Sequence, residues 1–159
     1  MAKTQITAEP GIPQIVITRE FEAPLDLVFR AYTDPQLIVR WLGPRELTTR
    51  FEHHEPRDGG RYRYVQTDPA GNEHGFHGVF HGEPSIDGIV QTFEYERVPG
   101  HVAMETVTFE DVDGRTLVRS VSSFQSVEDR DGMMTSGAEH GIRESDERLE
   151  ELLAELKGR

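Results

Sequence analysis

The last thirty residues constrain the fold of this chain more than any other segment, because they have the pattern of one long helix. Apolar side chains recur there at steps of three and four, and acidic side chains cover the opposite face. We therefore expect one helix over residues 128–157, laid across one face of a sheet. Its front half carries Gly132, Gly137 and Gly141, and each costs about 1 kcal/mol relative to alanine in a helix interior. Glycines at that cost indicate close packing or space left beneath the helix.

The apolar stripe of this helix identifies the side chains that face the sheet. In the front half the stripe is formed by Met134, Ala138, Gly141 and Ile142. Most of these side chains are small, so a curved sheet beneath them leaves a cavity. His140 lies at the border of the stripe and Glu139 on its flank, which favours solvated side chains over a general acid and base.

The composition excludes several classes of function. The 159 residues include 29 acidic and 17 basic side chains, which gives a net charge of -12. A field of that sign repels phosphate backbones and anionic lipid, so neither nucleic acid nor a membrane is an expected partner. The chain has no cysteine, which removes disulfides and thiolate metal sites. The first residues contain no apolar run of the kind found in a signal peptide or membrane span, so a cytoplasmic location is expected.

The rest of the chain predicts two short helices and an antiparallel sheet. Residues 14–21 have β-branched, extended character, and the proline-started segments PLDLVFRAYT and PQLIVRWLG then predict one short helix each. Six further segments alternate apolar and polar residues, with turn residues between them, and they span residues 46–53, 60–67, 74–83, 88–97, 102–110 and 115–125.

These elements combine into one prediction of the fold. We expect an α+β protein with a curved seven-stranded antiparallel sheet, two short helices, and a long C-terminal helix over a cavity. Residues 1–13 are expected to form a flexible N-terminal segment, and residues 14–157 a single domain.

Strand alternation places most of the aromatic side chains on the face that meets the helix. Tyr62 and Tyr64 share one face of their strand, and Phe93 and Tyr95 share one face of theirs. Together with the other large apolar side chains Trp41, Phe76, Phe80 and Met134, these residues are expected to line a site for a hydrophobic or aromatic ligand. The alternative is that these side chains fill the core completely. On the outer face two cross-strand pairs are expected, Glu94 with Arg63 and Glu96 with Arg61.

Seven histidines raise the question of a metal site, and their spacing argues against one. His74 and His77 have opposite strand parity and therefore point to opposite faces. His77 and His81 lie about 13 Å apart along an extended strand, which is too far for them to share one ion. Only cross-strand pairing with His53 would bring ligands together, so no metal is expected. The sequence also has no phosphate-cradling loop or nucleotide motif, so no cofactor is expected.

Five segments, in order along the chain, resemble the START-like, helix-grip superfamily, which is also called SRPBCC. They are APLDLVFRAYTDP at 23–35, WLGP at 41–44, DGGRYRY at 58–64, GVFHGEPSIDGIVQTFEYE at 78–96 and RDGMMTSGAEHGIRESDERLEELL at 130–153. Within the superfamily the chain looks most like the AHSA type, named for the C-terminal domain of the activator of the ninety-kilodalton heat-shock chaperone ATPase. The resemblance implies the helix-grip fold over residues 14–157. It also shows Ala138 where that branch commonly has methionine, a difference that would enlarge a cavity.

Three functions follow from the cavity and from the resemblance. The leading hypothesis is a protein that encloses a hydrophobic or aromatic small molecule, such as a lipid or polyketide, for carriage, sequestration or sensing. The second is a cyclase or dehydratase of the kind known on similar scaffolds, with Tyr62, Tyr64, Tyr95 or His140 moving protons. The third is a chaperone-associated module, although the full activator has an amino-terminal domain with no counterpart in this sequence. A homodimer through an edge strand is permitted but not required.

Overall fold

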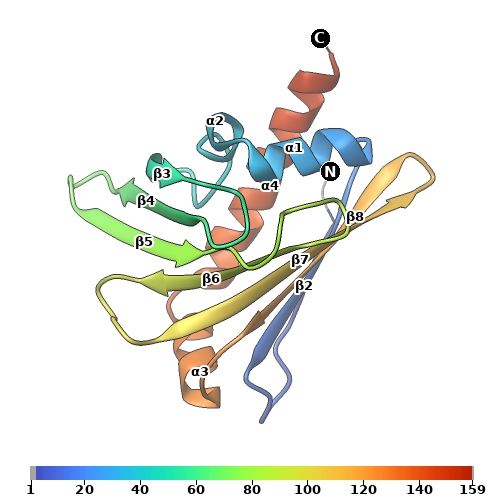
Figure 1. Cartoon of the computed structure of the whole chain (residues 1–159). Helices are drawn as coiled ribbons and strands as arrows, with labels where there is room; N and C mark the ends of the chain where they lie inside the picture. The colour runs from blue at the N-terminus through green and yellow to red at the C-terminus, as the bar shows by residue number, and fades with distance from the viewer. Residues whose placement is uncertain (1–2, 159) are drawn as a thin grey trace.

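The chain forms one antiparallel sheet with its helices packed against it, and the computed structural model describes residues 3–158. The strands are β1 (Lys3–Thr7), β2 (Gln14–Phe21), β3 (Thr48–His54), β4 (Arg61–Thr67), β5 (Glu73–Val79), β6 (Ile89–Tyr95), β7 (Val102–Val112) and β8 (Arg115–Ser123). The helices are α1 (Leu25–Thr33), α2 (Pro35–Ile38), α3 (Val127–Thr135) and α4 (Ala138–Lys157). The sheet order is β1-β2-β8-β7-β6-β5-β4-β3. In Figure 1, α4 runs behind the sheet, and α1 and α2 close its upper end. The predicted α+β, helix-grip fold is confirmed.

The sheet has eight strands, one more than predicted. The added strand, β1, lies in the segment that was expected to be flexible, and it pairs with β2 from Lys3↔Glu20 to Thr7↔Val16. The hydroxyl of Thr4 also donates to the carboxylate of Asp146 in α4, at 2.7 Å. The strand was missed because its order comes from contacts with β2 and α4, which are distant in sequence, and not from its own short pattern.

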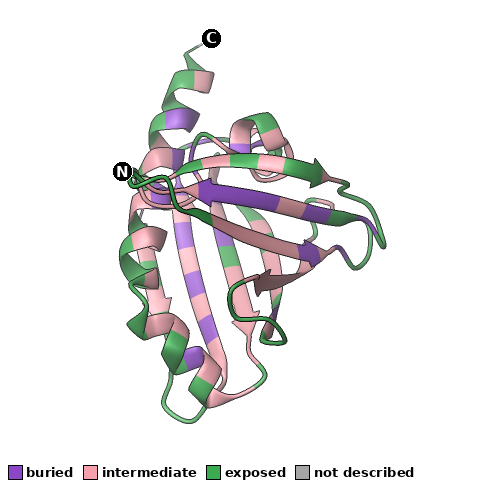
Figure 2. Cartoon of the chain, turned by 90° about the vertical axis from the view of Figure 1, so that its left-hand side faces the viewer, coloured by how far each residue is buried: buried purple, intermediate pink, exposed green. Residues whose placement is uncertain are grey.

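Strand alternation decides which side chains enter the interior. In β2 every second residue is buried, and the buried residues are Ile15, Ile17, Arg19 and Phe21. A strand with one face toward a core shows this period of two. Figure 2 shows the same division across the molecule, with exposed residues along the outer side of α3 and α4 and in the hairpin loops. The inward face of the sheet is therefore fixed by parity, and it includes one arginine.

The two short helices form where proline and aspartate permit a helix start. α1 follows Pro24, and α2 begins at Pro35, where Asp34 caps it by accepting a hydrogen bond from the backbone N–H of Gln36 at 2.9 Å. α2 ends at Ile38 and is shorter than the predicted helix. The next residues turn inward, so that the indole N–H of Trp41 donates to the carbonyl of Ala31 at 3.0 Å.

The predicted single C-terminal helix is two helices. α3 ends at Thr135, and α4 begins after Gly137, whose backbone has φ 90° in the left-handed region that favours glycine. A residue in that conformation interrupts the helical hydrogen bonds and changes the helical phase. The predicted inward stripe is therefore wrong for Met134, which precedes the break. It is right for Ala138, Gly141 and Ile142, which lie in α4.

The rear half of α4 packs against a filled core. Leu149, Leu152 and Leu153 are buried with Phe21 and Val28 in one hydrophobic cluster beneath α1. A second cluster lies on the far half of the sheet and contains Tyr62, Tyr64, Phe80 and Ile89. The front half of α4 faces the second cluster with small side chains. α4 therefore covers a filled core at its rear and open space at its front.

A buried ion pair connects α4 to the sheet. The Nε of Arg19 in β2 donates to the Oδ1 of Asp146 in α4 at 2.7 Å, and the two side chains are 10% and 2% exposed. Arg19 also donates to the hydroxyl of Ser120 in β8 at 2.8 Å. Together with the bond from Thr4, the pair joins three strands to the helix. Among residues 3–158, none of the helices is both long and apolar enough to cross a membrane.

The break at Gly137 yields a test that compares two glycines. Gly137→Ala should lower the free energy of unfolding by about 1 kcal/mol, because alanine is strained at a positive φ. Gly132→Ala, inside α3 with no atom within 4 Å of the added Cβ, should instead raise it by up to about 1 kcal/mol through helix propensity. Urea unfolding of the two variants measures both changes. Equal stabilisation by both alanines would mean that the helix is continuous.

The ion pair yields a second test. Asp146→Asn should lower the free energy of unfolding by about 3 kcal/mol, because it leaves the Arg19 charge buried without its partner. The neighbouring substitution Glu147→Gln, on the exposed face of α4, should change stability by less than about 0.5 kcal/mol. The double variant Arg19→Met/Asp146→Leu should recover most of the loss. Thermal or urea unfolding separates these outcomes, and a loss from Asp146→Asn as small as that from Glu147→Gln would contradict the anchoring role.

Candidate functional site

A cavity of about 380 Å³ lies between the sheet and the front half of α4. Its size falls in the range of small-molecule sites. Nine of the eleven residues predicted as ligand-binding line it: Trp41, Tyr62, Tyr64, Phe76, Phe80, Phe93, Ala138, Gly141 and Ile142. The sheet supplies most of the aromatic side chains, the segment after α2 supplies Trp41, and α4 supplies the small residues, in agreement with the parity of the strands and the helical stripe.

The aromatic wall of the cavity crosses β4, β5 and β6 as a stack of rings. The rings of Tyr64 and Phe76 are stacked with centroids 5.0 Å apart, and those of Phe76 and Phe93 are stacked at 5.4 Å. Tyr62 lies 6.1 Å from Tyr64, almost parallel to it. These flat surfaces suit a flat apolar molecule.

Two predicted residues, Tyr95 and Met134, do not line the cavity. Tyr95 is on the expected face and its ring stacks on Phe76 at 4.9 Å, but its hydroxyl bonds to Nδ1 of His74 at 2.8 Å near the end of β6. Met134 was assigned from a helix that continues past residue 137. Because the helix breaks there, Met133 reaches the cavity in its place.

The sequence analysis missed a row of polar residues in the floor of the cavity. Gln91 in β6 pairs with Glu105 in β7, and Glu105 pairs with Ser122 in β8, so the three lie side by side across adjacent strands. All three line the cavity. The signal was present in the sequence, because Glu105 has the parity of Ala103 and Val107, which face inward on the same strand.

Glu105 is half-buried and lines the cavity. Burial raises the pKa of its carboxyl from an ordinary value of 4.5 to about 7, against smaller opposing effects of the Arg19 charge and of hydrogen bonds from Gln91 and Ser122. The amide of Gln91 donates to Oε1 of Glu105 at 3.5 Å, which is the long limit of a hydrogen bond. This carboxyl is thus weakly bonded and poised to change protonation near neutral pH.

A second polar group lies at the end of the cavity beneath α1. The hydroxyl of Tyr32 is buried and has no hydrogen-bond partner among residues 3–158. Burial raises the pKa of Tyr32 to about 12, although the charge of Arg19 acts in the opposite direction. A buried hydroxyl without a partner is costly, so this atom is suited to bond a polar atom of a bound molecule.

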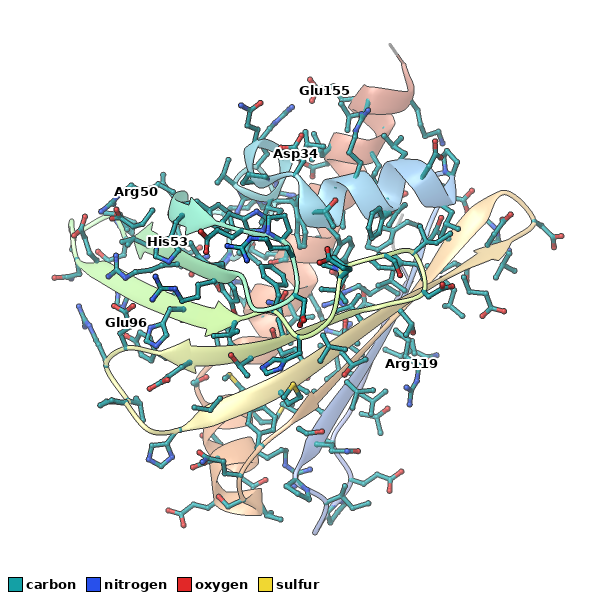
Figure 3. All side chains as sticks on the ribbon, in the orientation of Figure 1. Asp34, Arg50, His53, Glu96, Arg119 and Glu155 are labelled. Atoms are coloured by element: carbon teal, nitrogen blue, oxygen red, sulfur yellow. The ribbon has the colours of Figure 1, made fainter. Side chains whose placement is uncertain are left out.

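On the outer face of the sheet, His77 contacts carboxylates. His77 in β5 contacts Oε2 of Glu96 with Nδ1 at 2.8 Å, and Arg63 donates to the same carboxylate at 2.7 and 2.8 Å. These bonds, led by Arg63, lower the pKa of Glu96 to about 2. The predicted pairs were wrong, because Glu96 pairs with Arg63 and not Arg61, while Glu94 lies near His77. Figure 3 shows Glu96 and His53 on this outer side of the sheet.

One group of side chains has the spacing of metal ligands. The ligand atoms of Glu46, His140 and Glu144 all lie within 4.8 Å of one another. Glu46 and His140 are exposed, and Glu144 already accepts a hydrogen bond from the backbone N–H of Arg45 at 3.0 Å. Clusters of this kind are common on acidic surfaces, so it carries no functional assignment. Another histidine, His54, lines the cavity and is outside this group. Burial lowers the pKa of its ring.

Comparison with known proteins gives one family and many similar structures. The model of the family described as activator of Hsp90 ATPase homolog 1-like protein matches residues 22–154. A solved protein from Arthrobacter aurescens is 28% identical, with a TM-score of 0.87 over 95% of this chain and 91% of that one. One from Rhodobacter sphaeroides is 25% identical, with a TM-score of 0.86 over 96% and 99%. The AHSA1 protein from Silicibacter pomeroyi, at 18% identity, has a TM-score of 0.73 over 89% and 97%. Among curated proteins no match was found.

The raised pKa of Glu105 yields a test by pH. Between about pH 4.5 and 7 the folded protein keeps a proton that the unfolded chain has released, so Glu105 makes stability fall as pH rises through this window. Glu105→Gln should remove this component and leave the protein more stable than the parent at pH 8, by on the order of 2 kcal/mol. Urea unfolding from pH 4.5 to 8 measures the difference between the two proteins.

The matched control is Glu110→Gln, on the exposed end of the same strand. Its difference from the parent protein should stay within about 0.5 kcal/mol over the whole range. A flat difference for Glu105→Gln as well would mean that the carboxyl ionises at its ordinary pKa and is solvated.

Proposed function

The chain belongs to the family of activator of Hsp90 ATPase homolog 1-like proteins, within the START-like superfamily, and we propose that it encloses a hydrophobic small molecule. The bound molecule lies between the aromatic wall of the sheet and the front half of α4. The protein carries, sequesters or senses that molecule. The observation that supports the proposal most directly is the cavity of about 380 Å³, which remains beside a well-packed core at the other end of the same helix.

The energetics of the cavity agree with this role. Removing about 300 Å² of apolar ligand surface from water contributes roughly 7 kcal/mol before the entropy losses of binding. The stacked rings of Tyr64, Phe76 and Phe93 are already held by one another, so little side-chain entropy is lost when a flat ligand contacts them. Such a wall favours flat molecules over other shapes. The polar row in the floor can orient a bound molecule by hydrogen bonding to its polar atoms.

The enzyme alternative loses most of its nominated residues. Tyr95 lies outside the cavity and His140 is exposed. The hydroxyl of Tyr62 donates to the backbone carbonyl of Thr92 at 2.7 Å, and burial raises the pKa values of Tyr62 and Tyr64 further above that of a free phenol. Groups in that state are poor proton donors or acceptors near neutral pH. The four nominated residues therefore favour binding without turnover.

The chaperone-associated alternative would draw on exposed apolar surface. The large exposed apolar side chains among the described residues are Ile12, Ile86, Val98 and Met104. They come from four separate segments, three of them loops, whereas protein-binding sites gather such residues in one patch. The enclosed cavity is the stronger functional feature.

The proposal is tested by filling the cavity. Ala138→Phe places a ring in the cavity from the start of α4 and should weaken the binding of an uncharged apolar probe, N-phenyl-1-naphthylamine, by tenfold or more. The control Glu139→Phe adds the same ring on the exposed neighbour and should leave binding within about twofold. Probe fluorescence measures affinity, and native mass spectrometry of the parent protein tests for a co-purified adduct. Absence of both an adduct and probe binding would reject the proposal.

A further inference from the structure

The row formed by Gln91, Glu105 and Ser122 is set within an apolar floor. On one side of it the next inward pair is Phe93 with Ala103, and on the other side it is Ile89 with Val107. Inward residues two apart along a strand lie about 7 Å from each other. A ligand that lies along β6 and β7 would therefore meet apolar surface, then one polar row, then apolar surface again.

Among the described residues that line the cavity, Glu105 is the only one with a carboxylate. Its hydrogen bonds to neighbouring side chains are long or few. The amide of Gln91 donates to it at 3.5 Å, and the hydroxyl of Ser122 also bonds to it. Oxygen donors approach a carboxylate to about 2.5–2.7 Å when nothing prevents it. The carboxylate of Asp146, by contrast, receives two donors at 2.7 Å. Glu105 thus has capacity for a stronger donor from the cavity side.

The charges around the cavity select an uncharged donor. An anionic group would face the Glu105 carboxylate in a region of low dielectric, and the one cavity-lining arginine of the described chain, Arg19, is already paired with Asp146. A cationic group would lose its hydration in the apolar floor, a cost that pairing with one buried carboxylate often fails to offset. A hydroxyl avoids both costs, and it can bond a carboxyl in either protonation state.

We propose that Glu105, framed by Gln91 and Ser122, is the acceptor for an uncharged hydroxyl group on an otherwise apolar ring compound. This inference rests on the proposed function and adds to it the chemical class of the ligand. The unpartnered hydroxyl of Tyr32, at the α1 end of the same cavity, supports it independently, because it provides a second polar contact for a ligand that is not purely hydrocarbon.

The experiment compares the affinities of four probes with one skeleton: naphthalene, 2-naphthol, 2-naphthoate and 2-naphthylmethylammonium. The parent protein should bind 2-naphthol about tenfold to a hundredfold more tightly than naphthalene, the effect of one hydrogen bond to a carboxylate. Neither charged probe should bind more tightly than 2-naphthol. Displacement of N-phenyl-1-naphthylamine gives all four affinities on one scale.

Two variants assign the preference to the carboxyl. Glu105→Met, which keeps the length of the side chain without its oxygens, should reduce the ratio of 2-naphthol to naphthalene affinity by at least tenfold. Glu105→Gln keeps one acceptor and should give an intermediate ratio. Glu110→Gln, on the exposed end of β7, should leave the ratio of the parent protein. Circular dichroism of each variant shows that it is folded.

The outcomes separate this inference from the proposed function. If naphthalene binds the parent protein as tightly as 2-naphthol does, the cavity binds apolar molecules but the role of Glu105 is wrong. The same conclusion follows if the ratio is unchanged in Glu105→Met, or if a charged probe binds most tightly. If neither naphthalene nor N-phenyl-1-naphthylamine binds, the proposed function fails, and the inference fails with it.

Discussion

The position of α4 depends on the buried ion pair between Arg19 and Asp146. Two charges removed from water are tolerated here because Thr4 and Ser120 complete the hydrogen bonds of the pair. The pair lies between the two ends of the helix, next to the leucines that fill the core and near the small residues that leave the cavity open. Apolar packing alone can slide by a turn, whereas this bonded pair fixes the register. The shape of the cavity follows from that register.

The division of α4 into a packed half and an open half is also a division between stability and function. Leu149, Leu152 and Leu153 bury their side chains with Phe21 and Val28, and this burial, together with the ion pair of Asp146, holds the helix without large side chains at positions 138 and 141. The front half can then carry Ala138 and Gly141 and follow a helix break at Gly137. A protein that packed the whole helix would be more stable and would have no room for a ligand.

Sequence reasoning located what depends on local period and missed what depends on distant contacts. Alternation placed Tyr62, Tyr64 and Phe93 in the wall. The same parity rule places Arg19 and Glu105 inside, although charged residues usually face solvent and neither was considered as an inward residue. Strand β1 depends on pairing with β2, and the reach of Met133 depends on the backbone at Gly137. A periodic pattern predicts neither feature, because the first depends on pairing with a distant strand and the second on the backbone conformation of one glycine.

The two enclosed acids of this protein show how a structural carboxylate differs from one that faces a ligand. Asp146 receives hydrogen bonds from Arg19 and Thr4 at 2.7 Å and stands beside an opposite charge. Glu105 has the Gln91 amide at 3.5 Å, and burial raises its pKa to about 7. A carboxyl in that state weakens the folded protein above neutral pH, because its ionisation is unfavourable in the apolar floor. A glutamine or methionine at this position would give the fold at least as much stability, and this cost agrees with the proposed role of Glu105 as an acceptor for a bound molecule.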